Sequence, residues 1–181
     1  MTVLTLQRIV LGTSIAFSYT LFGNAITQSF MTIPALLADF PPPSSPDYSS
    51  RATLLGKQWP HCWAVGNVFF RPISTLGFLS YLYSAIVSYN NAAALGDYRL
   101  FAFCAVSNLI GIVHSAVNMQ PLNDKLASLN VESMEAKRAG ITSLKGQLKD
   151  GEAVLRKWGN WNLVRVVVPL LSGTIALSQF I

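Results

Sequence analysis

The residues whose types and spacing could do chemistry are polar side chains inside otherwise apolar stretches. His114 lies four residues before Asn118, directly after an apolar run. A later apolar stretch contains Trp158, Asn162 and Arg165 at spacings of four and three, which places them on one face of a helix. An imidazole base with amide and guanidinium donors suits removal of a proton from an acidic carbon, because the donors can hold the resulting enolate oxygen.

The same positions also have a purely structural interpretation. One helical face carries small and polar side chains at spacings of four and three: Cys104, Asn108, Gly111, Ser115 and Asn118. Gly, Ser and Asn are residues through which membrane helices pack closely. Arg165 lies near enough to the start of its apolar stretch to reach the membrane surface, where tryptophans also anchor helices. The spacing therefore leaves both a packing seam and a ligand pocket open.

Other kinds of site lack the residues that they need. The chain has two histidines and two cysteines, no Glu-x-x-His pair and no carboxylate inside an apolar stretch, so we predict no metal centre. A phosphate-binding glycine loop and a serine nucleophile motif are also absent. A haem with His114 as its one protein ligand stays open as an alternative. Apart from that, we expect no bound cofactor.

The elements that must position these residues are membrane helices. Of the 181 residues, 51% are hydrophobic and 12% are charged, whereas soluble domains carry about 25% charged residues. No Asp, Glu, Lys or Arg occurs between positions 8 and 39, 71 and 97, or 99 and 124. Each gap exceeds the roughly 20 residues that a spanning helix needs. A soluble enzyme, a disordered regulator and a nucleic-acid-binding module are therefore disfavoured.

We predict an all-α fold, a four-transmembrane-helix bundle with a long polar, partly helical loop before the last helix. It forms a single integral membrane domain over residues 1–181. The polar loops are 39–60, which contains a proline-rich run, and 124–157, and Pro121 is expected to end the third helix. The first apolar run is too long for a signal peptide. The predicted spans are 4–36, 61–89, 98–120 and 157–179.

Lysine and arginine set the predicted orientation and partners. Nine of them fall in the two polar loops, whereas the opposite ends of the helices carry Arg8 and Arg99. Both loops are therefore expected in the cytosol. The expected surroundings are a lipid bilayer, and the basic residues show no pattern for nucleic acid. In a eukaryote the default membrane is the endoplasmic reticulum, and the sequence leaves the oligomeric state open.

Two motifs resemble signatures of the DUF1772 family, whose best-known members are anthrone oxygenases of fungal polyketide pathways. The third predicted helix contains His114-x3-Asn118-x2-Pro121-x-Asn123-x2-Leu126, which is similar to one signature. The fourth opens with Trp158-x3-Asn162-x2-Arg165, which is similar to another. A Gly- and Ser-rich first helix that ends near Pro34 is a further similarity. The resemblance covers nearly the whole chain.

The resemblance implies oxidation of an aromatic polyketide anthrone to an anthraquinone, with O2 as co-substrate and without metal, flavin or nicotinamide. For this reaction we expect two groups of residues. The expected catalytic residues are His114, Asn118, Asn162 and Arg165. The expected substrate-binding residues are Trp158, Trp63, Asn108 and Asn123.

Two alternatives remain at this point. One is a non-oxidative tailoring enzyme of secondary metabolism, such as a cyclase or an isomerase, which would not need O2. The other is a non-enzymatic membrane scaffold in which the polar stripes are packing seams. A transporter is disfavoured because the two halves of the chain show no matching interrupted helices.

Overall fold

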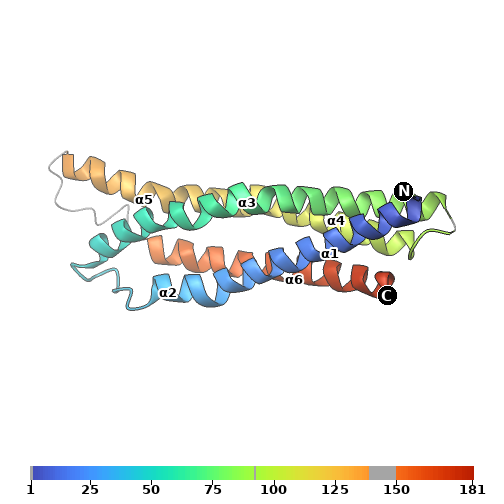
Figure 1. Ribbon diagram of the computed structural model, residues 1–181. Helices are drawn as coiled ribbons and strands as arrows, with labels where there is room; N and C mark the ends of the chain where they lie inside the picture. The colour runs from blue at the N-terminus through green and yellow to red at the C-terminus, as the bar shows by residue number, and fades with distance from the viewer. Residues whose placement is uncertain (1, 92, 139–149) are drawn as a thin grey trace. The chain divides into compact units, whose positions relative to one another are not determined.

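The computed structural model describes residues 2–91, 93–138 and 150–181, and this part of the chain is helical without strands (Figure 1). The predicted all-α fold is confirmed. The elements in chain order are α1 (Val3–Thr27), η1 (Gln28–Thr32), α2 (Ile33–Leu37), α3 (Tyr48–Asn90), α4 (Tyr98–His114), η2 (Ser115–Met119), α5 (Gln120–Arg138) and α6 (Gly151–Phe180), where η1 and η2 are π-helical turns.

Three helical stretches are long and apolar enough to cross a membrane, and the protein is membrane-embedded. These stretches are Val3–Leu37, Tyr98–Glu135 and Gly151–Phe180. They contain the first, third and fourth predicted spans. Large hydrophobic side chains remain more than half exposed on them, as on Ile9 and Ile110, where lipid rather than water is the compatible surrounding.

The helix α3 differs from the three apolar stretches. It contains the whole predicted span 61–89, but it is not among the described helices that are apolar enough to cross a membrane. Serines, tyrosines and the Arg71–Pro72 pair interrupt its apolar residues. The helical bundle therefore fits a membrane protein, whereas a membrane span in α3 stays a prediction.

Both polar loops are shorter than predicted. Residues 48–60 belong to α3, and residues 124–138 and 151–157 belong to α5 and α6. These segments are helical because their regularly spaced apolar side chains pack into a core, as Leu126 and Leu129 do with 0% and 2% exposure. The rest of the predicted loop 124–157, residues 139–149, lies outside the described residues.

Neither Pro34 nor Pro121 ends a helix, so the expected helix end at Pro121 is wrong. Helical structure is continuous over residues 3–37 and again over 98–138. In each case a π-helical turn stops two residues before the proline. A proline has no N–H and its ring clashes with the carbonyl four residues earlier. A π-turn widens the helix at that place, so the chain can continue through the proline.

The helices contribute to two compact units. Unit 1 comprises residues 1–26, 68–115 and 163–181, and unit 2 comprises residues 27–67 and 116–162. The two units differ in charge. Unit 1 contains only five charged residues, and every other charged residue of the chain belongs to unit 2; the five are Arg8, Arg71, Asp97, Arg99 and Arg165.

Unit 1 is packed around the buried ring of Tyr81 on α3. The phenol hydroxyl lies 2.8 Å from Ser18 Oγ and donates to the Ser14 carbonyl at 3.3 Å. Both partners belong to α1. Phe101 and Cys104 of α4 are fully buried in the same cluster. A single aromatic residue therefore joins α1, α3 and α4 through its ring and its hydroxyl.

The turn between α3 and α4 is held by the buried side chain of Gln7. Its amide nitrogen donates to Ser88 Oγ at 2.9 Å and to the Leu95 carbonyl at 3.2 Å, while its oxygen accepts from Leu95 N at 2.9 Å. Gly96 follows with a φ of 68°, a value that favours glycine. Asp97 then caps α4.

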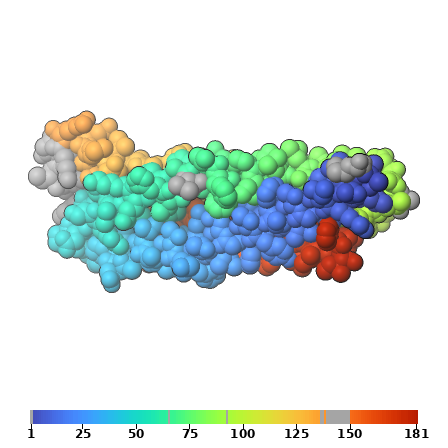
Figure 2. Space-filling model, in the orientation of Figure 1, coloured from blue at the N-terminus to red at the C-terminus, as the bar shows by residue number. Residues whose placement is uncertain are grey.

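Unit 2 contains a second core, which is formed by α2, α3, α5 and α6. Side chains of α2 and of the first turns of α3 lie side by side (Figure 2). Arg51 of α3 donates to the carbonyls of Leu36 and Ala38, which satisfies two acceptors at the end of α2. The fully or nearly fully buried members of this core include Ala52, Leu55, Trp59, Met119, Leu126, Leu129, Leu155 and Trp158.

At Gly56, α3 and α5 approach each other closely. A Cβ atom at Gly56 would lie 2.6 Å from the backbone nitrogen of Asn130 and 2.9 Å from Leu129 Cβ. The first of these atoms belongs to the α5 backbone and cannot move away alone. The absence of a side chain at Gly56 is therefore a requirement of the packing in unit 2.

We expect Gly56→Ala to destabilise the protein by about 1–3 kcal/mol, because the new methyl group forces α3 and α5 apart. Thermal unfolding of the detergent-solubilised protein measures this. Gly23→Ala is the matched control, because a Cβ atom there meets nothing within 4 Å and alanine favours a helix. An unchanged unfolding temperature for Gly56→Ala would contradict the close approach.

Candidate functional site

The carboxamide oxygen of Asn123 joins three helices of unit 2. Asn123 Oδ1 accepts the indole N–H of Trp158 at 2.8 Å and that of Trp59 at 3.2 Å. Asn123 belongs to α5, Trp59 to α3 and Trp158 to α6, and all three side chains are buried. Because an indole nitrogen can only donate, the two contacts fix the acceptor as the amide oxygen.

The two indoles that share Asn123 also pack against each other. Their ring centroids are 4.9 Å apart and their planes meet at 79°, an edge-to-face arrangement. Aromatic pairs favour this geometry, and each ring also removes a large apolar area from solvent. The hydrogen bonds and the ring contact together leave Trp59 and Trp158 little freedom to move.

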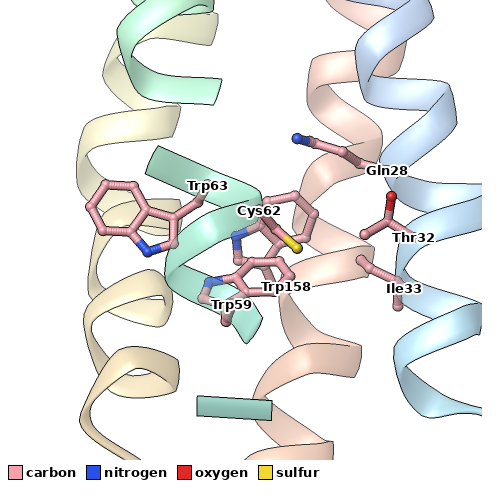
Figure 3. Close-up of a pocket in the computed structure, with 7 residues that line it drawn as sticks. All are labelled: Gln28, Thr32, Ile33, Trp59, Cys62, Trp63 and Trp158. Carbon is pink, nitrogen blue, oxygen red and sulfur yellow. The ribbon is translucent and has the colours of Figure 1, made fainter. Parts of the chain in front are cut away.

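A small recess opens beside this tryptophan pair (Figure 3). It is bounded by α3, α6, η1 and the first residue of α2. The residues that line it are Gln28, Thr32, Ile33, Trp59, Cys62, Trp63 and Trp158. The lining is aromatic and apolar with a few polar atoms, which is the composition of sites for flat organic ligands.

The recess is narrow as it stands. Its volume of about 10 Å³ is close to the minimum that holds one water molecule. A three-ring aromatic compound therefore needs the lining side chains to move. Trp59 and Trp158 are fixed by Asn123, whereas Cys62 is small and only partly buried. Widening at the Cys62 side leaves the tryptophan pair intact.

Trp63 differs from the other two tryptophans of the recess. Its indole nitrogen is buried and has no hydrogen-bond partner among the residues that the structure describes. Asn67 lies one turn further along α3, and its amide nitrogen is likewise buried without such a partner. The predicted substrate-binding residue Trp63 thus lines the recess and carries an unused donor.

Asn162 anchors α6 to η1 in unit 2. Its amide nitrogen donates to Ser29 Oγ at 2.9 Å, and the residue is fully buried. Three residues earlier, a Cβ atom at Gly159 would lie 3.2 Å from Ile33 Cδ1, so α6 and α2 are in close contact. Asn162 is therefore held in a defined position one turn from Trp158.

In unit 1, the predicted polar face of α4 has the contacts of a packing seam. Asn108 donates to the carbonyl of Cys104 in its own helix at 2.8 Å, and the Cys104 thiol donates to the Ser172 carbonyl at 3.5 Å. A Cβ atom at Gly111 would lie 3.6 Å from Val168 Cγ1. Small and polar residues here let α4 and α6 approach. The expected substrate-binding role of Asn108 stays a prediction.

The remaining predicted residues are distributed over both units. His114, which is 7% exposed, is the last residue of α4 in unit 1, and Arg165 is a partly buried residue of α6 in the same unit. Asn118 lies in η2 and belongs to unit 2. Each unit therefore contributes part of the predicted catalytic set. Among the described residues, no three His, Cys, Asp or Glu side chains are grouped in a way that could hold a metal ion.

Sequence reasoning did not assign Trp59, Asn67 or Gln28 to the site. A signal existed for the first two, because Trp59, Trp63 and Asn67 repeat every four residues and so share one face of α3. Gln28 also follows Asn24 by four residues, but its place in the recess depends on the packing of η1 in unit 2.

We expect Asn123→Leu to lower the unfolding temperature by about 5–15 °C, because two buried indole N–H groups lose their acceptor together. Asn90→Leu is the control, since exposed Asn90 bonds only to a carbonyl of its own helix. Equal unfolding temperatures of the two variants, measured by circular dichroism in detergent, would show that Asn123 does not hold the tryptophan pair.

The comparison with known families gives the site its context. A model of the anthrone oxygenase family matches residues 59–175, which is well over half of the chain. The matched part includes all the predicted site residues and four of the seven residues that line the recess. No curated protein and no solved structure matches the chain. The resemblance seen in the sequence motifs is confirmed, and the chain belongs to the anthrone oxygenase family.

Proposed function

We propose that this membrane protein oxidises an aromatic polyketide anthrone to the anthraquinone with O2 and without a bound cofactor. Membership of the anthrone oxygenase family carries the proposal. The tryptophan-lined recess in unit 2 supports it, because indole rings stack on flat aromatic ligands. An apolar anthrone dissolves in lipid, so it can reach the protein from the bilayer.

In the proposed reaction, His114 acts as the base. It is the buried one of the two histidines, since His61 is exposed. The neutral imidazole removes a proton from the methylene carbon opposite the ketone of the anthrone, and the electron pair delocalises over the rings onto the ketone oxygen. Positioned acid–base catalysis of this kind contributes about 10²–10⁴-fold.

The anion then reacts with O2. It transfers one electron to O2, and the two radicals combine to form a carbon–oxygen bond. The imidazolium of His114 returns its proton to give a hydroperoxide. Loss of the second hydrogen from the same carbon, with cleavage of the O–O bond, releases water and leaves the new carbonyl. One O2 is consumed for each quinone and each water that form.

Donors that lower the energy of the anion complete the proposal. We assign this task to Asn118, Asn162 and Arg165, whose amide and guanidinium groups stabilise negative charge on oxygen. Fixed donors in an environment of low dielectric constant need no reorganisation when the charge develops. Asn162 supports this assignment by its burial and its hydrogen bond to Ser29.

We expect washed membranes that contain the protein to consume O2 and form quinone in a ratio of one to one when a simple anthrone is supplied without added cofactor. An oxygen electrode measures the O2 that is consumed, and absorbance spectroscopy measures the quinone that forms. Membranes with Arg165→Ala at equal abundance should show only the spontaneous rate, because a charge-stabilising group is lost. Conversion of a polyketide without O2 would instead indicate a cyclase or an isomerase.

We also expect His114→Ala to lower the rate above the spontaneous background by at least about 100-fold, because the proposed base is missing. His61→Ala is the matched control, since it removes the exposed imidazole, and it should retain the full rate. Quinone formation in membranes with equal amounts of each variant measures the effect. A folded His114→Ala variant with full turnover would remove His114 from the proposed role.

A further inference from the structure

Two buried donors on one face of α3 have no acceptor among the described residues. They are the indole nitrogen of Trp63 and the amide nitrogen of Asn67. Residues four apart on a helix are neighbours on its surface, so the two groups lie next to each other. Both belong to unit 2. Donors buried in this way weaken folding unless another group accepts their hydrogen bonds.

The other two indoles of the recess each have a hydrogen-bond acceptor within the protein. Trp59 and Trp158 both donate to Asn123 Oδ1. Trp63 has the same type of donor and lines the same recess, yet it does not share this acceptor. Internal hydrogen bonds thus fix Trp59 and Trp158 in unit 2, whereas the N–H group of Trp63 is available to a ligand.

The position of Trp63 shows where a bound acceptor would lie. In Figure 3 its ring extends from α3 away from Gln28 and Thr32, and Trp59 and Trp158 lie between. An acceptor for the Trp63 N–H therefore lies on the side of the tryptophan pair that is away from Gln28 and Thr32. An oxygen substituent on the rim of a flat ring system is suited to that position.

We propose that Trp63 and Asn67 bind a ketone oxygen on the ring system of the aromatic ligand. Both groups are uncharged N–H donors, and no charged side chain lines the described recess, so the pair matches a carbonyl or enolate oxygen better than a phosphate or a cation. The inference rests on the proposed function for the identity of the ligand. Beyond the proposed function, it predicts that Trp63 and Asn67 make the protein prefer ring systems that carry a ketone over those that do not.

The test compares two flat three-ring probes, anthraquinone, which has ring ketones, and anthracene, which has none. Their affinities are measured by equilibrium dialysis of purified protein in detergent, with protein-free micelles as background. Trp63→Phe and Asn67→Leu should each weaken anthraquinone binding about tenfold and change anthracene binding less than twofold. The matched controls are Trp161→Phe, an exposed indole on α6, and Asn90→Leu, an exposed amide on α3.

Thermal unfolding separates ligand binding from a structural role. Because each variant removes a buried donor that has no partner among the described residues, its unfolding temperature should stay the same or rise. A lower unfolding temperature together with weaker binding of both probes would overturn the inference. It would show that the side chains support the fold.

The remaining outcomes distinguish this inference from the proposed function. If the wild-type membranes oxidise anthrone but both variants bind anthraquinone as the wild type does, the inference fails and the proposed function stands. If the wild type oxidises no anthrone but binds anthraquinone, and the variants bind anthraquinone more weakly, the proposed function fails and the ketone site stands. Failure of the wild type to bind anthraquinone overturns the inference.

Discussion

The geometry of the candidate site depends on one oxygen atom. Asn123 Oδ1 receives hydrogen bonds from Trp59 and Trp158 and so ties α3 and α6 to α5. The edge-to-face contact of the two rings follows from this shared acceptor. The recess in turn takes its shape from the fixed ring pair. The buried carboxamide of Asn123 thus shapes the recess because it fixes the positions of the Trp59 and Trp158 rings.

The buried asparagines of the two units make different contacts. In unit 1, Asn108 and Ser115 bond to carbonyls of their own helix, and Gly111 leaves room for a neighbouring helix. These contacts satisfy polar groups within the helix, as the apolar surroundings require. In unit 2, Asn123 and Asn162 instead join different helices. The contacts of Asn108, Gly111 and Ser115 thus fit the packing-seam interpretation, whereas Asn123 and Asn162 hold different helices of unit 2 together.

The sequence predicts the helical class and four membrane spans, three of which lie in apolar helices, because charge gaps and hydropathy are local properties. It misplaces the ends of α3 and α5, since Leu126 and Leu129 become core residues only when α3 packs against them. The proline rule fails at Pro121 because a π-turn precedes it. For the site, the sequence indicates the residue types. Which donor meets which acceptor depends on contacts between segments more than 30 residues apart, such as Trp158 with Asn123.

The number of donors and acceptors explains why three tryptophans of one recess differ in role. A carboxamide oxygen has two lone pairs and accepts two hydrogen bonds. Both positions on Asn123 Oδ1 are occupied by Trp59 and Trp158, so this acceptor has no capacity for the indole of Trp63. The indole N–H of Trp63 is therefore left over because Asn123 Oδ1 accepts only two hydrogen bonds. The N–H group of Trp63 is therefore the one that our proposal gives to a ligand oxygen.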